Sequence, residues 1–116
     1  MKLQIVSTAA DQQHVALQGR LDSAGVDAVE SQFNAAVVAR RKPVIVDLTQ
    51  VEFLSSMGVR MLLSAAKALQ RAGVRMVLVA SGQVVTTALT HSAIDELIPV
   101  AADVDGARAL LSSPTR

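Results

Sequence analysis

Two short apolar runs separated by an amphipathic segment constrain the fold more than any other feature of this chain. Residues 44–48 and 75–80 are almost continuously apolar and rich in β-branched side chains, which is typical of strands buried on both faces of a parallel sheet. Between them, from about residue 56 to residue 72, apolar side chains recur at the spacing of one helix face: Val59, Leu62, Leu63, Ala66 and Leu69. Gly73 then stands where a helix commonly ends. We therefore predict a strand–helix–strand unit with parallel strands.

The segments on either side of this unit predict further short elements. Residues 3–7 and 14–17 are strand candidates, and the turn-like residues 10–13 between them suggest a hairpin. After the unit we expect a short helix at residues 84–91, a last strand at residues 97–100 and an amphipathic helix at residues 103–111.

A helix is also predicted between the hairpin and the first buried strand. Residues 19–23 are expected to form a loop, in which Asp22 or Ser23 caps this helix. Its inward stripe consists of Val26, Val29, Phe33, Ala36 and Val37. Together the elements predict an α/β fold, in which a mixed β-sheet opened by a hairpin is covered by about four helices. The length of 116 residues fits a single domain, residues 1–116.

The composition excludes several classes of function. The chain is 51% hydrophobic and 18% charged, which indicates a globular domain, and its net charge of +1 argues against a nucleic-acid groove. The absence of cysteine rules out disulfides and thiolate metal sites. No apolar run approaches the roughly 18 residues of a membrane span. We expect a cytoplasmic protein with no metal, no cofactor, no direct nucleic-acid contact and no direct membrane insertion.

An enzyme is not expected from the candidate nucleophiles and bases. The two histidines, His14 and His91, have no neighbours at metal-ligand spacing. A Gly-x-Ser-x-Gly elbow, which would point to a hydrolase, is also missing. Asp47 is expected to accept hydrogen bonds from backbone amides nearby.

The loop after the first buried strand ends in two serines, Ser55 and Ser56. Ser55 is positioned to cap the next helix by accepting from the amide of Met57 or Gly58, which makes Ser56 the first helical residue. Free amide groups and the helix dipole at that end favour a phosphate group, bound or covalently attached. Serine caps are common, however, so the local pattern leaves open a purely structural role.

The segment from Asp47 to Gly58 resembles the signature of STAS domains, the family that includes bacterial anti-sigma factor antagonists. The positions that match in register are Asp47, Leu48, Val51, Phe53, Leu54, Ser56 and Gly58. Three other segments agree with the family pattern, at residues 19–22, 72–73 and 94–100. The similarity thus spans nearly the whole chain and implies the mixed sheet covered by helices that the pattern predicts.

The resemblance also implies a set of site residues. Ser56 matches the family's phosphoacceptor, with Ser55 as the alternative acceptor. The implied partner-binding residues are Asp22, Ser55, Ser56, Met57, Gly58 and Met61. Three positions depart from the family: Ser55 replaces an aspartate, Met57 a small residue, and Ala93 a frequent glycine. Core filling remains the alternative role for Met57 and Met61.

The function implied by the resemblance is that of an anti-sigma factor antagonist. Such a protein binds an anti-sigma factor in its unphosphorylated state, and phosphorylation at Ser56 would switch it off. The implied partner is an anti-sigma factor and serine kinase of the histidine-kinase-like ATPase class. Two alternatives without phosphorylation stay open: a STAS subunit of an ABC-type phospholipid transporter and a stressosome-like scaffold. A weak homodimer and nucleotide binding are also left open.

Overall fold

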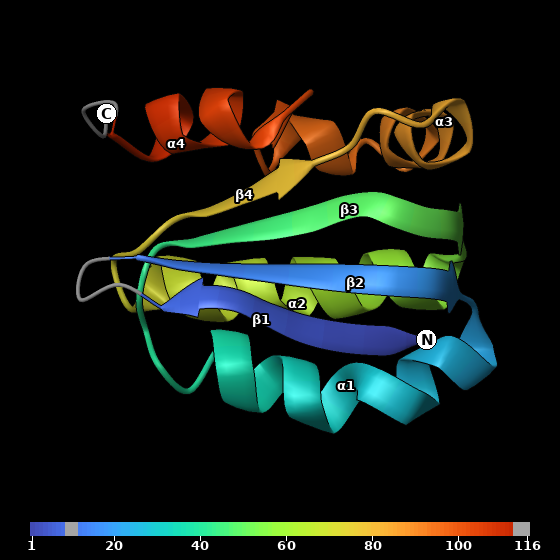
Figure 1. Ribbon diagram of the computed structural model, residues 1–116, viewed down its shortest axis with the longest axis horizontal. Helices are drawn as coiled ribbons and strands as arrows, with labels where there is room; N and C mark the ends of the chain where they lie inside the picture. Colours follow the sequence, from blue (N-terminus) through green and yellow to red (C-terminus); the bar gives the residue numbers. More distant parts are fainter. Residues whose placement is uncertain (9–11, 113–116) are drawn as a thin grey trace.

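The computed structural model describes residues 1–8 and 12–112. Within these residues the chain forms a five-stranded sheet in the order β1-β2-β3-β4-β5 (Figure 1). The strands are β1 (Lys2–Thr8), β2 (Gln13–Leu21), β3 (Val44–Leu54), β4 (Met76–Val79) and β5 (Val100–Ala101). The helices are α1 (Ser23–Val37), α2 (Ser56–Arg71), α3 (Gln83–His91) and α4 (Val104–Ser112), with the 3₁₀ turn η1 (Ile94–Glu96) after α3.

The sheet is mixed, as the sequence predicts. β1 pairs antiparallel with β2, whereas β2, β3, β4 and β5 pair with one another in parallel. The parallel pairs are joined by helical crossovers, which parallel strands require. The α/β fold class, the hairpin pairing and the helical cover are therefore confirmed. Part of the predicted turn at residues 10–13 lies outside the described residues.

Two strands extend beyond their predicted ends. β2 continues to Leu21 through the predicted loop at residues 19–23, and β3 continues to Leu54 rather than stopping at residue 48. The two extensions pair with each other, so each supplies the hydrogen-bond partners that the other needs. The register shifts next to Gly19, whose φ of 112° is a backbone conformation that glycine adopts readily. Pairing between distant segments therefore overrides the local loop signal.

A smaller correction concerns the last strand. The sequence predicts it at residues 97–100, whereas in the structure η1 is followed by a turn at residues 97–99 and β5 is Val100–Ala101. Ile94 and Ile98, both buried, anchor the turn to the main core. The apolar character of this segment thus comes from packing and not from a strand.

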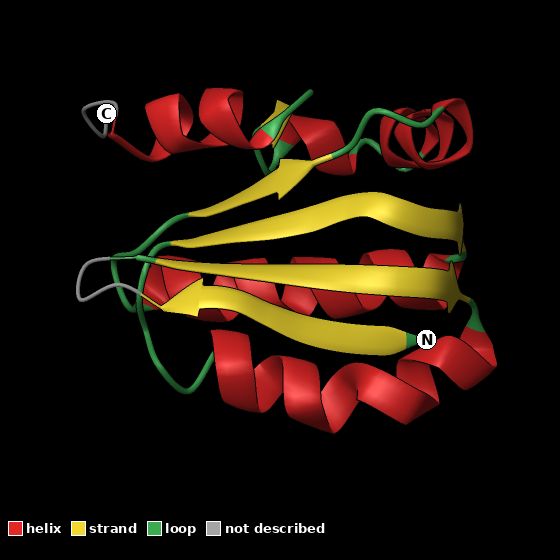
Figure 2. Ribbon diagram, viewed as in Figure 1, coloured by secondary structure: helices red, strands yellow, loops and turns green. Residues whose placement is uncertain are grey.

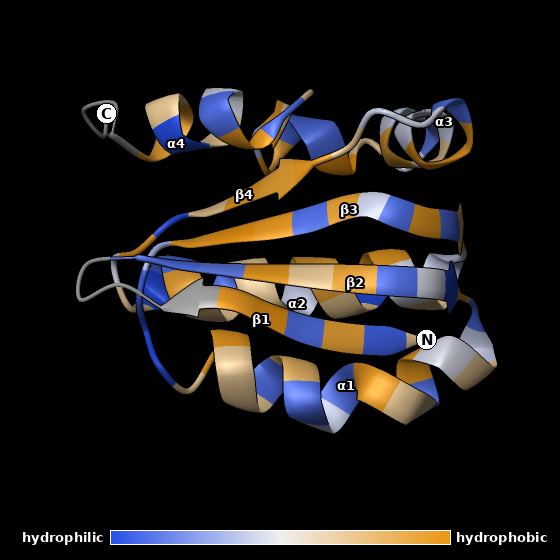
Figure 3. Cartoon of the chain, viewed as in Figure 1, coloured by the Kyte–Doolittle hydropathy of each residue, from blue (hydrophilic) through white to orange (hydrophobic). Residues whose placement is uncertain are grey.

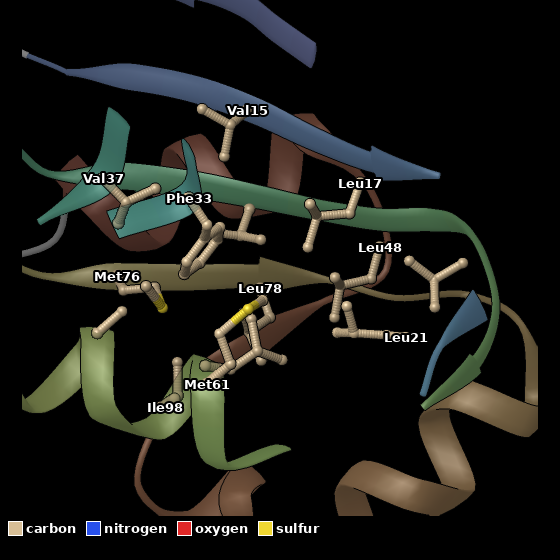
Figure 4. Packing of buried hydrophobic residues seen from close by; sticks show 14 of the residues in the cluster. Val15, Leu17, Leu21, Phe33, Val37, Leu48, Met61, Met76, Leu78 and Ile98 are labelled. Atoms are coloured by element: carbon tan, nitrogen blue, oxygen red, sulfur yellow. The ribbon is translucent and has the colours of Figure 1, made fainter. Parts of the chain in front are cut away.

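The two faces of the sheet are covered unequally. The larger core joins β2, β3 and β4 to α1, α2 and α3, and α2 passes behind the strands in Figure 2. Phe33 of α1, Met61 of α2 and Leu78 of β4 belong to this core, and Figure 4 shows them near its centre. A smaller cluster on the other face joins α4 to β3 and β4. β4, apolar along its length in Figure 3, is buried between the two.

Candidate functional site

Two helices begin at the same end of the sheet, directly after the carboxyl ends of β2 and β3. β2 ends at Leu21 and α1 begins at Ser23, while β3 ends at Leu54 and α2 begins at Ser56. Leu21 and Leu54 are register partners in the parallel pair, so the starts of both helices are brought together. This arrangement gathers Asp22, Ser55, Ser56 and Met57 at the carboxyl ends of the strands.

Ser55 caps α2, and its hydroxyl both accepts and donates a hydrogen bond. The hydroxyl oxygen accepts from the Gly58 N–H, with 3.2 Å between the oxygen and the nitrogen. The same hydroxyl donates to the Leu21 carbonyl oxygen at 2.8 Å, and the Ser55 N–H donates to that oxygen at 3.0 Å. The predicted cap is confirmed. Ser55 also ties the start of α2 to the end of β2, a role that sequence reasoning missed.

Ser56 lies in a different environment. It is the first residue of α2, and its side chain is exposed. Within the described part of the chain, the structure gives its hydroxyl no hydrogen-bond partner. Of the two neighbouring serines, Ser56 thus has the hydroxyl that another protein can reach without breaking a structural contact.

Asp22 caps α1 with one carboxylate oxygen and meets Arg20 with the other. Its Oδ1 accepts from the Gly25 N–H at 2.9 Å, and its Oδ2 lies 3.6 Å from the Arg20 Nε. The hydrogen bond from Gly25 lowers the pKa of Asp22, and the Arg20 charge adds to the effect. The carboxylate is therefore kept ionised at this edge, although it is partly open to solvent.

Arg20 is also held over an aromatic ring. Its guanidinium carbon lies 4.7 Å from the centre of the Phe53 ring, a distance at which a cation–π contact forms. Arg20 and Phe53 are register partners on β2 and β3. The sequence pattern does not predict this contact, because it places residue 20 in a loop; only the pairing of the two strands brings Arg20 next to Phe53.

The remaining predicted partner-binding residues divide into exposed and buried positions. Met57 is 41% exposed, next to Ser56. Met61 is only 2% exposed and packs in the core with Leu62, so its expected place in a contact patch is corrected to core filling. Residues 57 and 61 are one helical turn apart and lie on the same side of α2, but only residue 61 is covered by the core.

Gly58 is buried because α2 starts very close to the strands. A Cβ at this position would come within 2.8 Å of both Leu21 Cγ and Leu54 Cδ1. Gly58 therefore has a packing role: it lets the first turn of α2 approach the sheet. It shapes the loop that presents Ser56 and offers no side chain of its own to a partner.

A second polar pair lies further back on the sheet. His14 Nε2 is 3.8 Å from Asp47 Oδ2. Asp47 Oδ1 accepts from the Thr49 N–H at 2.9 Å and from the Thr49 hydroxyl at 2.7 Å, so the predicted backbone contact of Asp47 is present.

Over residues 1–8 and 12–112, no three His, Cys, Asp or Glu side chains gather in a way that could hold a metal ion. Every helix described there is too short or too polar to traverse a bilayer.

Comparison with known proteins identifies relatives of this fold. The sequence model of the STAS domain matches residues 7–107. An anti-sigma factor antagonist from Mycobacterium paratuberculosis is 23% identical, with a TM-score of 0.84 over 97% of this chain and 96% of that one. The anti-sigma factor antagonist SpoIIAA in its unphosphorylated form is 16% identical, with a TM-score of 0.76 over 98% of this chain and 100% of that one.

A phosphorylated relative is also similar in structure. SpoIIAA from Bacillus in the phosphorylated form is 16% identical, with a TM-score of 0.68 over 94% of this chain and 99% of that one. No curated protein matches the chain by sequence. At these identities, the structural likeness establishes the shared fold.

Proposed function

The chain belongs to the STAS domain family, and from that premise we propose that it acts as an anti-sigma factor antagonist switched by phosphorylation of Ser56. In this proposal the unmodified protein binds an anti-sigma factor, which is also a serine kinase of the histidine-kinase-like ATPase class. Transfer of a phosphate to Ser56 ends the binding and frees the anti-sigma factor to hold its sigma factor.

The observation that carries this proposal is the difference between the two serines. The Ser55 hydroxyl is engaged with the Leu21 carbonyl and the Gly58 amide, whereas the Ser56 side chain is exposed at the first position of α2. A kinase acting on Ser56 meets no structural hydrogen bond that must be broken. This difference favours Ser56 over Ser55 as the acceptor.

The proposed switch follows from charge. A phosphate adds about 1.5 to 2 negative charges and three acceptor oxygens. At the start of α2 these charges face the positive end of the helix dipole, so the fold tolerates them. A partner that packs over this loop must strip water from the phosphate, which costs far more than covering a neutral hydroxyl.

The residues beside Ser56 support a docking surface at this edge. Met57 offers an exposed and adaptable apolar side chain, while Asp22 offers a carboxylate that is kept ionised. Ser55 and Gly58 contribute by fixing the backbone of the loop. The proposed contact surface is therefore Asp22, Ser56 and Met57, on a frame made by Ser55 and Gly58.

A binding series with a candidate anti-sigma factor kinase from the same genome tests the proposal. We expect Ser56→Asp to weaken binding by about a hundredfold, because a carboxylate must be desolvated on docking. Isothermal titration calorimetry gives the dissociation constants. Incubation of the wild-type protein with the kinase and ATP, followed by mass spectrometry, is expected to place the phosphate on Ser56.

Ser64→Asp is the matched control for this series. Ser64 is another exposed serine of α2, two turns further along, and its substitution is expected to change binding by less than about twofold. The switch is refuted if Ser56→Asp binds like the wild type and neither serine of the loop is modified. That result, with docking on an ABC-type ATPase subunit, would favour the role of a transporter subunit.

A further inference from the structure

The outer face of α2 carries a stripe of exposed polar side chains that begins at Ser56. Its members follow one another at spacings of three or four residues and are Ser56, Arg60, Ser64, Lys67 and Arg71. The opposite face of the helix is buried and consists of Gly58, Met61, Leu62, Ala65 and Leu69. Because the buried face fixes the rotation of the helix, Ser56 and Arg60 must lie on the same outer face.

Ser56 and Arg60 are four residues apart, which makes them neighbours on that face. Side chains on a helix lean toward its N-terminus, so a long side chain at position 60 lies over the preceding turn, where residue 56 stands. An anionic residue followed four positions later by a cation is also the more stabilising order for such a pair.

The charges around Ser56 differ in their availability. At the same edge, Arg20 is already engaged with the Asp22 carboxylate at 3.6 Å and with the Phe53 ring at 4.7 Å. Arg60 has no ion pair in the described part of the chain, and its side chain is exposed. Glu52 is exposed four residues before Ser56 in the sequence, and as an anion it does not attract a phosphate.

We infer that Arg60 holds the phosphate of phosphorylated Ser56 across one turn of α2. This inference rests on the proposed function, since it concerns the modified state of the same serine. The guanidinium of Arg60 donates to the phosphate oxygens, a charge-assisted contact for which its planar fork is well suited. Phosphorylation then changes the docking surface in two ways. It adds an anion at Ser56, and it pairs the Arg60 guanidinium with that anion, so that Arg60 is no longer available to a partner.

The test uses the full chain with phosphoserine placed at position 56 during synthesis, so that no kinase is needed. The second pKa of the phosphate, near 6 for a free phosphoserine, is followed by ³¹P NMR as the pH is varied. We expect Arg60→Gln to raise this pKa by about 0.15 to 0.4, because the cation that favours the doubly charged form is lost. Arg60→Lys is expected to restore most of the effect.

Arg20→Gln is the matched control, since it removes the other exposed arginine of this edge. Its effect on the phosphate pKa is expected to be less than about 0.1. The inference is overturned if the phosphate titrates alike in the Arg60→Gln variant and in the protein that keeps Arg60. It is also overturned if Arg20→Gln shifts the phosphate pKa more than Arg60→Gln does. Because the phosphate is installed directly, a failure of the proposed kinase switch would leave this measurement unaffected.

Discussion

At the scale of single residues, the residues that follow α2 and α3 show how a left-handed backbone conformation favours glycine. After α2, Gly73 has a φ of +79° and its N–H donates to the Gln70 carbonyl, so the predicted glycine at the helix end is confirmed. After α3, Ala93 occupies the equivalent position with a φ of 59°. STAS domains often have a glycine at the position that matches residue 93. The left-handed backbone explains this preference, because a Cβ is strained in that conformation.

Ala93→Gly is therefore expected to stabilise the protein by about 0.5 to 1 kcal/mol. The relief of the left-handed strain at residue 93 exceeds the entropy that glycine adds to the unfolded chain. The free energy of unfolding in urea measures the difference. Ala88→Gly, inside α3, serves as the control and is expected to destabilise by about 1 kcal/mol. If Ala93→Gly lowered the free energy of unfolding as much as Ala88→Gly does, this account would be contradicted.

At the scale of elements, the starts of α1 and α2 depend on side chains that also define the candidate site. Asp22 caps α1 and Ser55 caps α2, each by accepting from the amide of a glycine three residues later. Sequence alone predicts Ser55 as the cap of α2 and leaves the cap of α1 open between Asp22 and Ser23, because serine and aspartate before an apolar helical stripe are a local signal. The bridge from Ser55 to Leu21 joins the two helix starts, and it depends on strand pairing that no local pattern contains.

The cap of α1 is expected to make stability depend on pH. The pKa of Asp22 is lowered below its ordinary value of 3.8, so the ionised carboxylate stabilises the fold above about pH 4. This contribution is lost as the pH falls through the lower pKa of the folded state. Asn also caps helices but carries no charge, so Asp22→Asn isolates the charge.

Urea unfolding of wild type and Asp22→Asn across pH 2–7 checks this prediction. The wild type is expected to be the more stable at neutral pH, and the two curves should converge in acid. A difference that stays constant down to pH 2 would mean that the charge of Asp22 is not responsible.

At the scale of the whole molecule, the sheet separates a large core from a small one. The side chains of Phe33, Met61 and Leu78 belong to the larger core, which α1 and α2 cover. α4 covers the other face through a cluster that includes two alanines, Ala101 and Ala107. Less apolar surface is buried under α4, so its local opening should cost less free energy than that of α2.

Hydrogen exchange measures this difference directly. Amides in the middle of α4 are expected to exchange at least about tenfold faster than those in the middle of α2, a difference of about 1.4 kcal/mol. Arg75→Met removes the side-chain donor that bonds to the Leu110 carbonyl and should speed exchange in α4 alone. Equal protection of the two helices would show that the smaller cluster does not limit the stability of α4.

The sequence by itself determined the order of the elements, the inward stripe of α1 and the place of the two serines, whereas of the stripe expected on α2 only Leu62 and Leu69 are buried. These features follow from the spacing of apolar residues and from capping chemistry, which act over a few neighbouring positions. Tertiary structure decided the full length of β2 and β3, the contact of Arg20 with Phe53 and the burial of Met61. Each of these depends on which distant segment supplies a hydrogen bond or a packing surface, and spacing along the chain does not carry that information.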